Sequence, residues 1–473
     1  MRRIMENKNC VRIESIKIEN FKNVQYGYID FENKRKDYRA SILGLYGQNG
    51  SGKTALIDAF QVLKFVLCGQ PVPVKYADYV NVEEACSVLE FQFRIKREEQ
   101  IYNVWYQFSL KKEADDSVTN ENDIPESKVK YRAKIFDEVL SFSYKFKEKK
   151  SRKGLLIDTR STLAFAPKAK YDELLANVNE DLLEIYLTKR LAWTQSRSFI
   201  FSKEMMNRFR RCCENKIYMT VLEGLCTFGN TELFVINTEH EGLINMNALP
   251  LSFKFKEKGK ESLGNLLLPL DGPAPIPKAA MELVKKIVDN MNIVLQQLIP
   301  GLTIDVMDLE PIVSSDGEMG YLVQLMSLKN SKKIPFKYES EGIKKIVSIL
   351  QLLIVVYNNP SITVAVDEID SGIFEYLLGE LLNIISEKGK GQLIFTSHNL
   401  RPLETIDKGF IAFTTTNPKN RYIRLTNVKG NNNLRDFYYR DIVLGEQNEQ
   451  VYNPTNNFEI ALAFREAGEA FGS

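Results

Sequence analysis

The stretch that decides the fold is Ser41-Ile42-Leu43-Gly44-Leu45-Tyr46-Gly47-Gln48-Asn49-Gly50-Ser51-Gly52-Lys53-Thr54. Its first six residues are typical of an apolar strand, and the residues from Ala55 to about Leu67 are typical of a helix. The eight residues between them satisfy the pattern GxxxxGK[ST]. Glycines let successive backbone N–H groups curl around phosphate oxygens, and the N-terminus of the helix adds a partial positive charge. Strand, loop and helix together predict a phosphate-binding loop.

The residues of this loop have separate expected roles. The ammonium group of Lys53 should reach the β- and γ-phosphates of a nucleotide, and the hydroxyl of Thr54 should hold Mg²⁺. The other nucleotide-binding residues expected in the loop are Gly47, Gln48, Asn49, Gly50, Ser51 and Gly52. The alternative is a chance glycine-rich turn, and the flanking strand and helix argue against it.

A second motif follows the apolar strand Ile362–Val366, where two carboxylates stand together at Asp367 and Glu368. Ligands of parallel sheets bind outside the carboxyl ends of the strands, so these residues belong near the phosphate loop. Asp367 is expected to bind Mg²⁺ directly or through water. Glu368 is expected to orient the attacking water and remove its proton as a general base. A strand that ends in Asp-Glu is common and by itself does not indicate a function. Together with the phosphate loop, this pair favours a functional role.

His398 follows the next expected strand, Gln392–Thr396. A histidine there can donate a hydrogen bond to the γ-phosphate or hold the attacking water, although a lone histidine is more often structural. Its position one helix and one strand after Glu368 favours a catalytic role. The catalytic residues expected from the sequence are therefore Glu368, His398 and Lys53.

Ser340 and Gly342 precede the expected helix Ile343–Tyr357. Taken locally, Ser340 is a helix N-cap. Taken with the other motifs, the hydroxyl and the bare glycine N–H form a second anion site, too far from Lys53 to serve the same nucleotide. A two-fold dimer would solve this geometry, because Ser340 and Gly342 of one subunit would then close over the ATP of the other.

Composition limits the class of protein. The 473 residues are 44% hydrophobic and 26% charged, which is typical of a soluble protein with more than one structural unit. The 63 Lys and Arg nearly balance the 61 Asp and Glu, which excludes a histone-like polycation. No apolar run is long enough to span a bilayer, and the first residues are too polar for a secretory signal. Six cysteines without CxxC spacing favour a reducing compartment, so a cytoplasmic location without a membrane partner is expected.

Three regions are expected along the chain. Residues 1–115 would form an N-terminal lobe with the phosphate loop, 116–265 an inserted α+β domain, and 266–473 a C-terminal lobe with the remaining motifs. The insertion would open with a hairpin made of Lys128–Ile135, a turn at Asp137-Glu138, and Ser141–Lys147. Period-two side chains place four cations on one face of its first strand, namely Lys128, Lys130, Arg132 and Lys134. That face could bind phosphates or could simply be solvated.

The motifs as a set resemble the ABC-type ATPases of the SMC, RecF and OLD group. The residues that carry the resemblance are Asn20-Phe21-Lys22, Gly47–Thr54, Ser340-Glu341-Gly342, Val364–Asp370 and Ser397-His398-Asn399. It implies an α/β fold, an ABC-type P-loop ATPase head with a mixed sheet and an antiparallel β lobe. It also implies that Lys22 and Asn23 contact the nucleotide, that Ser340-Glu341-Gly342 is the signature motif, and that Asp370 belongs to the D-loop. The expected cofactors are ATP and Mg²⁺.

The sequence departs from that group in several places. The signature is not the LSGGQ of transporters, and the only candidate for the Q-loop glutamine is Gln92. The insertion lacks heptads, so no long coiled-coil arm is expected. The residues after His398 are too few for the Toprim nuclease domain of OLD proteins, and no nuclease site of its own is expected.

Within the group, the chain is similar to the AAA-type ATPases of two-gene phage-defence systems of the PARIS or Septu kind. That resemblance implies an ATP-hydrolysing switch that forms a homodimer or a larger homo-oligomer. A Toprim or HNH nuclease encoded by a neighbouring gene would be its effector, and a phage protein or DNA its trigger. The alternative is a RecF-like DNA repair or recombination ATPase that binds DNA directly, while a transporter subunit is disfavoured.

Overall fold

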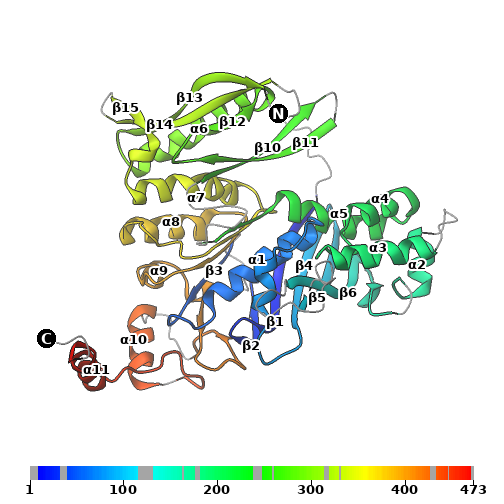
Figure 1. The fold of residues 1–473 in the computed structure, drawn as a ribbon, viewed down its shortest axis with the longest axis horizontal. Coiled ribbons are helices and arrows are strands. Elements are labelled where there is room, and N and C mark those ends of the chain that lie inside the picture. Colours follow the sequence, from blue (N-terminus) through cyan, green and yellow to red (C-terminus); the bar gives the residue numbers. More distant parts are fainter. Residues whose placement is uncertain are drawn as a thin grey trace, which may run out of the picture.

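The computed structural model describes residues 9–31, 40–114, 131–161, 164–175, 182–237, 248–257, 260–313, 319–329, 332–426, 433–445 and 447–469. Two large sheets lie on either side of helix α1 (Lys53–Leu67), which packs against both (Figure 1). Nearly every residue of α1 is buried. On one side, Phe60 contacts Phe31 and Phe91 of the first sheet. On the other side, α1 meets Ala365 and Ile394 of the second sheet in one hydrophobic cluster.

The six-stranded sheet carries the motifs. Its order is β19 (Tyr422–Ile423), β18 (Ile411–Thr414), β3 (Ser41–Tyr46), β17 (Gln392–Thr396), β16 (Thr363–Val366) and β9 (Leu233–Ile236). The strands from β18 to β9 are parallel, and β19 is antiparallel at the edge. Every residue of β3, β16 and β17 is buried, because helices or the other sheet cover both faces. The three strands expected next to the motifs are thus present and adjacent.

The seven-stranded sheet is antiparallel throughout. It contains β1 (Cys10–Phe21), β2 (Val24–Asp30), β4 (Ser87–Arg97), β5 (Gln100–Ala114), β6 (Tyr131–Phe146), β7 (Lys149–Lys150) and β8 (Gly154–Asp158). Alternate residues of β4 are buried, as expected for a sheet with one face on the core. The α/β class predicted from the sequence, a mixed sheet joined to an antiparallel lobe, is confirmed.

The predicted basic hairpin is wrong. Strand β6 runs without a turn through Asp137 and Glu138, with a register irregularity opposite Gln107/Ser109 and a positive φ of 50° at Asp137. Glu138 is fully buried rather than exposed in a turn. Its carboxylate accepts hydrogen bonds from Ser198 Oγ (2.6 Å) and from the backbone N–H of Phe199 (2.6 Å). Lys128 and Lys130 lie outside the described residues.

The segment expected to be a separate insertion contributes to both sheets. Strand β6 pairs with β5 across the expected boundary at residue 115, and β9 pairs with β16 of the six-stranded sheet. Helix α5 (Lys216–Thr231) packs on α1. The helices α2 (Lys168–Leu175), α3 (Leu182–Thr194) and α4 (Lys203–Cys212) lie beside β6 at the edge of the molecule (Figure 1). Residues of this segment therefore take part in the two large sheets and in their hydrophobic core.

Further strands and helices share a second hydrophobic cluster with the six-stranded sheet. They are the hairpin β10 (Ala248–Glu257) and β11 (Lys260–Pro269), the sheet of β12 (Ala274–Pro277), β13 (Leu302–Val313), β14 (Met319–Lys329) and β15 (Lys332–Pro335), and the helices α6 (Lys278–Leu298), α7 (Glu341–Asn358) and α8 (Glu375–Lys388). The proline-rich residues 272–277 contain β12, an edge strand, where proline is tolerated. The chain ends with α9 (Pro402–Thr405), α10 (Leu434–Leu444) and α11 (Asn457–Glu469). Over the described part of the chain, no helix combines the length and apolar character needed to cross a membrane.

Candidate nucleotide-binding site

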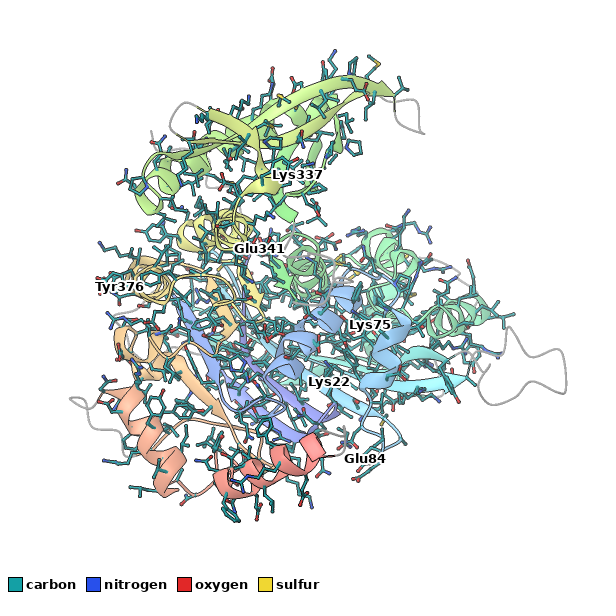
Figure 2. The ribbon with its side chains drawn as sticks, turned by 60° about the vertical axis from the view of Figure 1, so that its left-hand side comes forward. Lys22, Lys75, Glu84, Lys337, Glu341 and Tyr376 are labelled. Atoms are coloured by element: carbon teal, nitrogen blue, oxygen red, sulfur yellow. The ribbon has the colours of Figure 1, made fainter. Side chains whose placement is uncertain are left out.

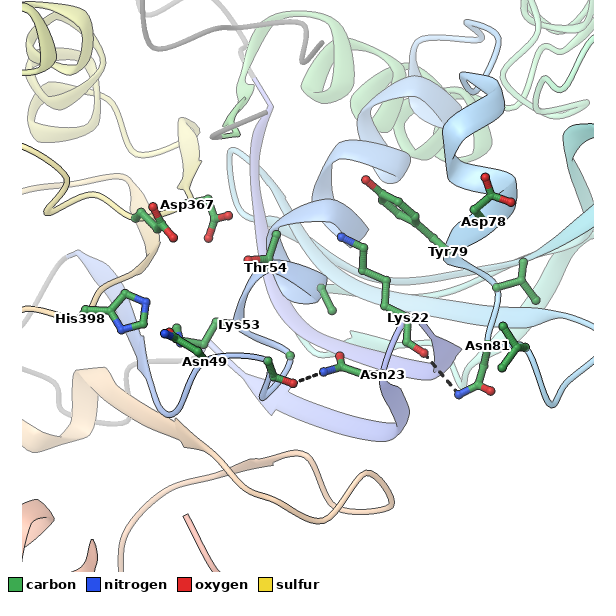
Figure 3. Close-up of a pocket in the computed structure, with 16 residues that line it drawn as sticks. Lys22, Asn23, Asn49, Lys53, Thr54, Asp78, Tyr79, Asn81, Asp367 and His398 are labelled. Carbon is green, nitrogen blue, oxygen red and sulfur yellow. Dashed lines mark hydrogen bonds between the residues drawn. The ribbon is translucent and has the colours of Figure 1, made fainter. Parts of the chain in front are cut away.

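Three neighbouring strands deliver the predicted motifs to one pocket. Strand β17 lies between β3 and β16, so the phosphate loop after β3, His398 after β17 and the carboxylates after β16 emerge side by side. The pocket has a volume of about 600 Å³ (Figure 3). Its lining consists of Lys22, Asn23, Asn49, Gly50, Gly52, Lys53, Thr54, Ala55, Asp78, Tyr79, Val80, Asn81, Val82, Asp367, Glu368 and His398.

The phosphate loop adopts the backbone conformation that its glycines were expected to allow. Gly50 and Gly52 adopt φ angles of 74° and 92°, which side chains with a Cβ rarely accept. Lys53 Nζ donates to the carbonyl oxygens of Gly47 (2.8 Å) and Gln48 (3.1 Å), so the lysine arches over the loop. Burial lowers the pKa of Lys53, while the nearby Asp367 and Glu368 oppose that shift. A cation held among loop carbonyls and carboxylates is suited to a phosphate.

Residues on or next to β18 and β19 hold the phosphate loop in place, and the sequence did not predict their role. A Cβ at Gly47 would lie 1.8 Å from Thr414 Oγ1, so the approach of Thr414 requires glycine there. Arg421 donates to the carbonyl oxygens of Asn23 (2.6 Å) and Thr415 (2.6 Å). The hydroxyl of Tyr422 donates to the carbonyl oxygen of Gly52 (3.0 Å). No local sequence pattern indicates these residues, because β18 and β19 lie next to the phosphate loop in space but are far from it in the sequence.

A single hydroxyl positions both carboxylates that follow β16. Thr396 Oγ1 donates to Asp367 Oδ1 (2.6 Å) and accepts from the backbone N–H of Glu368 (2.7 Å). Asp367 is buried, with 1% of its surface exposed, whereas Glu368 is partly exposed and lines the pocket. Glu368 has a φ of 47°, a left-handed backbone that is uncommon for glutamate. Backbone strain of this kind clusters at functional sites, which supports a role for Glu368 in the reaction.

His398 is exposed and faces the pocket with its side chain. Its backbone N–H donates to Asp370 Oδ2 (3.0 Å), as does the N–H of Asn399 (2.9 Å). Figure 3 shows the imidazole pointing toward Lys53 and Asn49. Asp370, expected in the D-loop, therefore anchors the segment that carries the histidine.

The far end of the pocket is made by two loops in contact. Lys22 forms an ion pair with Asp58 and lies 3.9 Å from the ring centroid of Tyr79, while Asn23 donates to the carbonyl oxygen of Gly50. The backbone N–H of Lys22 donates to the carbonyl oxygen of Tyr79 (2.6 Å). Residues Asp78–Val82 complete this end, although the sequence contained no signal for them. The remainder of a nucleotide bound by its phosphates could lie against this wall.

Ser340 and Gly342, both in the described part of the chain, are not among the residues that line the pocket. Ser340 caps α7 by accepting from the backbone N–H of Ile343 (3.4 Å). A Cβ at Gly342 would lie 2.4 Å from the carbonyl oxygen of Gly372, so the start of α7 packs tightly on the segment after Asp370. Figure 2 shows Glu341, which lies between them in the sequence, well separated from Lys22. The expected second anion site is therefore not brought to this pocket within one chain.

Two further residues bear on the site. Lys345, buried in the second turn of α7, has a pKa that burial lowers to about 8 against the attraction of Asp370, Asp367 and Glu368. This lysine links the start of α7 electrostatically to the carboxylates. Gln92, the weak candidate for a Q-loop glutamine, lies within β4 and donates to Glu14 (3.2 Å). It does not line the pocket that the described residues form.

The donor set fits a nucleoside triphosphate with magnesium. The positive-φ glycines and Lys53 could hold phosphates, and the hydroxyl of Thr54 faces the same pocket as the carboxylate of Asp367. Mg²⁺ commonly takes one or two protein oxygens and completes its shell with phosphate and water. Across the described residues, no group of three or more His, Cys, Asp or Glu side chains could hold a metal ion.

A family model described as an AAA domain matches residues 15–207, a span that includes the phosphate loop and the first sheet. No curated protein matches the chain. Among solved structures, the SMC head domain from Thermotoga maritima is 13% identical, with a TM-score of 0.35, over 88% of this chain and 99% of that chain.

Two further solved structures are SMC heads in complexes. An Smc head bound to the C-terminal winged-helix domain of ScpA is 13% identical, with a TM-score of 0.35, over 87% of this chain and 97% of that chain. An Smc head domain with an extended coiled coil, bound to the C-terminal domain of ScpA derived from Pyrococcus furiosus, is 12% identical. Its TM-score is 0.34, over 88% of this chain and 96% of that chain. From its own strand order, phosphate loop and AAA-domain match, the chain has the fold of a P-loop ATPase.

Proposed function

We propose that this chain binds ATP with Mg²⁺ and hydrolyses it to ADP and phosphate. The observation that carries the proposal is the meeting of Lys53, Glu368 and His398 in one pocket, from three adjacent strands. Chance would seldom place a phosphate loop, a carboxylate pair and a histidine at neighbouring strand ends. The AAA-domain match over residues 15–207 supports the same class of activity.

Each residue has a specific task in this proposal. Lys53 binds and neutralises the terminal phosphates, and Glu368 removes the proton from the attacking water. Thr396 fixes the backbone of Glu368 and the side chain of Asp367 by its two hydrogen bonds. His398 donates to the terminal phosphate or holds the water. When bound, Mg²⁺ held by Thr54 and Asp367 would supply charge neutralisation on the phosphates.

The site is completed by a second copy of the chain. Ser340 and Gly342 lie outside the pocket, yet they offer a hydroxyl and a glycine N–H at the start of α7, where the helix dipole favours an anion. A two-fold dimer would bring these groups over the nucleotide of the partner. ATP binding would then favour the closed pair and hydrolysis would release it, which is a switch between two states.

The finer proposal concerns the biological role. The resemblance of the motif set to phage-defence ATPases supports a sensor that controls a separate nuclease of Toprim or HNH type. The alternative, a RecF-like repair ATPase, would bind DNA itself. Co-expression with the products of the neighbouring genes, followed by purification and mass determination, separates the two. A stable complex with a nuclease supports the first, and a chain that binds DNA without a nuclease partner supports the second.

Substitution of the phosphate-loop lysine tests the ATPase proposal directly. Lys53→Ala should abolish ATP binding, because the phosphates lose their main cation. The exposed Lys419 provides a matched control, and Lys419→Ala should bind ATP like the wild type. Binding is measured with a fluorescent ATP analogue and turnover by phosphate release. Equal ATP affinity in Lys53→Ala and wild-type protein would overturn the assignment of this pocket.

A further inference from the structure

A second cavity lies at the other end of the antiparallel sheet. It has a volume of about 310 Å³ and lies where the ends of β5 and β6 meet α3, a region visible beside β6 in Figure 1. Its lining consists of Glu113, Ala114, Arg132, Lys134, Arg190, Trp193 and Thr194. None of these residues lines the nucleotide pocket. The cavity is therefore a separate feature with its own chemistry.

Cations outnumber carboxylates around this cavity. Glu113 pairs with Lys111 (3.0 Å), with Arg132 (2.9 Å) and with Lys134 (3.1 Å). Burial raises the pKa of Glu113, but hydrogen bonds from Arg132, Lys111 and Lys134 outweigh it and hold the pKa at about 2. The carboxylate is thus ionised at neutral pH, yet it supplies one negative charge against three cations. Arg190 on α3 is a further cation, and with Arg132 and Lys134 it makes three cations that line the cavity itself.

Two donors at the cavity have capacity for another acceptor. Among the described residues, none forms a hydrogen bond or ion pair with the exposed guanidinium of Arg190. The indole Nε1–H of Trp193 is buried and has no acceptor within the described part of the chain. A buried donor left without an acceptor is costly, typically by about 1–3 kcal/mol. An anionic acceptor in the cavity would reach the exposed guanidinium of Arg190, whereas the Nε1–H of Trp193 is not exposed to the cavity.

The tryptophan ring is itself surrounded by positive charge. Lys134 Nζ lies 5.0 Å from the ring centroid of Trp193, and Lys189 Nζ lies 5.1 Å from it. Lys189 is buried, and its ammonium group donates to the carbonyl oxygen of Thr159 (2.6 Å), which fixes it in place. Lys189, which does not line the cavity, therefore adds a buried positive charge beside the ring, and the ring lines the cavity together with Lys134 and Arg190.

We propose that this cavity binds the phosphate group of a phosphate ester, either a free nucleotide or a nucleotide of a nucleic-acid strand. Guanidinium groups bind phosphate oxygens in a bidentate manner, and lysines add point charges. A water molecule occupies about 30 Å³ in the liquid, so the cavity of about 310 Å³ has room beyond one phosphate for part of its ester. The site is independent of the ATPase pocket and would give the protein a second ligand.

Charge reversal at Arg190 tests this proposal with little risk to the fold, because Arg190 is exposed whereas Arg132 and Lys134 are paired within the sheet. The measurements use the full chain carrying Lys53→Ala, so that the phosphate loop does not capture the probe. The probe is a fluorescently labelled, 5′-phosphorylated single-stranded DNA oligonucleotide. Its affinity is measured by fluorescence anisotropy over a range of salt concentrations. Unlabelled AMP and inorganic phosphate serve as competitors.

Arg190→Glu should weaken binding of the oligonucleotide at least about tenfold and reduce its salt dependence, because one phosphate contact is lost and a repulsion is added. Arg152→Glu is the matched control, since Arg152 is an exposed arginine between β7 and β8 that does not line the cavity. Arg190→Lys should retain most of the affinity. Competition by AMP would identify a free nucleotide as a ligand, and binding of the strand without such competition would identify nucleic acid. Equal affinities of Arg190→Glu and Arg152→Glu, or no saturable binding of any probe, would overturn the proposal.

Discussion

At the residue scale, the geometry around Glu368 depends on Thr396. Its hydroxyl connects the N–H of Glu368 with the carboxylate of Asp367, two residues with different proposed tasks. Sequence alone placed both carboxylates at the end of a strand, because a buried apolar run followed by Asp-Glu is a local pattern. It could not reveal the threonine, whose contact crosses from β17 to β16. The left-handed backbone of Glu368 is likewise invisible before the structure.

Glu368→Gln provides the test of the proposed general base. The amide keeps the size of the side chain but cannot take a proton, so ATP should still bind while turnover falls by about 10²–10⁴-fold. ATP binding and phosphate release measured on the same preparation separate the two effects. Glu387→Gln, at an exposed position on α8 outside the pocket lining, is a control for loss of one carboxylate. Comparable turnover in Glu368→Gln and wild-type protein would remove Glu368 from this role.

At the scale of elements, strands with local patterns were predictable and their partners were not. The strands β3, β16 and β17 were expected near their observed bounds, since each is an apolar run. Strand β9 was missed, although Leu233-Phe234-Val235-Ile236 is an apolar run. Four residues are a weak signal, and their pairing with β16 joins segments that are distant in the chain.

Strand β6 shows why a local interpretation failed. Asp137-Glu138 is a common turn pair, but here the carboxylate of Glu138 is buried and accepts several hydrogen bonds. Tyr106, Ser198 and the backbone N–H of Phe199 all donate to it. Tertiary hydrogen bonds can stabilise a carboxylate inside a strand that the sequence pattern would expose. The continuous strand then brings Arg132 and Lys134 beside Glu113, where they form ion pairs instead of a free basic face.

These ion pairs predict a pH dependence of stability for β5 and β6. The pKa of Glu113 is about 2 in the folded chain against an ordinary 4.5, so the ionised form stabilises the fold above pH 4.5. That contribution is lost as the pH falls from 4.5 toward 2. Glu113→Gln should therefore lower the free energy of unfolding at pH 7, and its difference from the wild type should shrink below pH 4.5. Urea unfolding between pH 7 and 3 measures this difference.

Glu148, which is exposed in the turn between β6 and β7, supplies the control for the urea series. Glu148→Gln should change the free energy of unfolding much less than Glu113→Gln, because exposed ion pairs contribute little. A difference between Glu113→Gln and the wild type that stayed constant down to pH 3 would contradict the role assigned to the ion pairs.

At the scale of the whole molecule, the proposed catalytic residues and the start of α7 lie apart within one chain. Lys53, Glu368 and His398 meet in one pocket, while Ser340 and Gly342 begin a helix outside its lining. Gly342 also has a reason within the chain, because the carbonyl oxygen of Gly372 leaves no space for a Cβ. The requirement for glycine thus has two possible origins, and only an experiment on pairs of subunits distinguishes a shared site from local packing.

Mixing two inactive variants provides that experiment. Ser340→Arg should block closure by its bulk while its own Lys53 still binds ATP, and Lys53→Ala should lose ATP but retain Ser340. In a mixed pair, the Lys53 of one subunit faces the Ser340 of the other, so one composite site is intact and the second is broken twice. ATPase activity should return in part when Ser340→Arg is mixed with excess Lys53→Ala, and neither variant alone should show it.

A folding control is needed for Ser340→Arg, because loss of the N-cap alone costs about 0.5–2 kcal/mol. Circular dichroism shows whether this variant is folded. Strict cooperation between two sites would also prevent recovery, so cysteines introduced at Ser340 and Gly50 in Glu368→Gln protein provide the second measurement. If ATP produces neither recovered activity nor a crosslink between subunits at these positions, the two copies do not share the site.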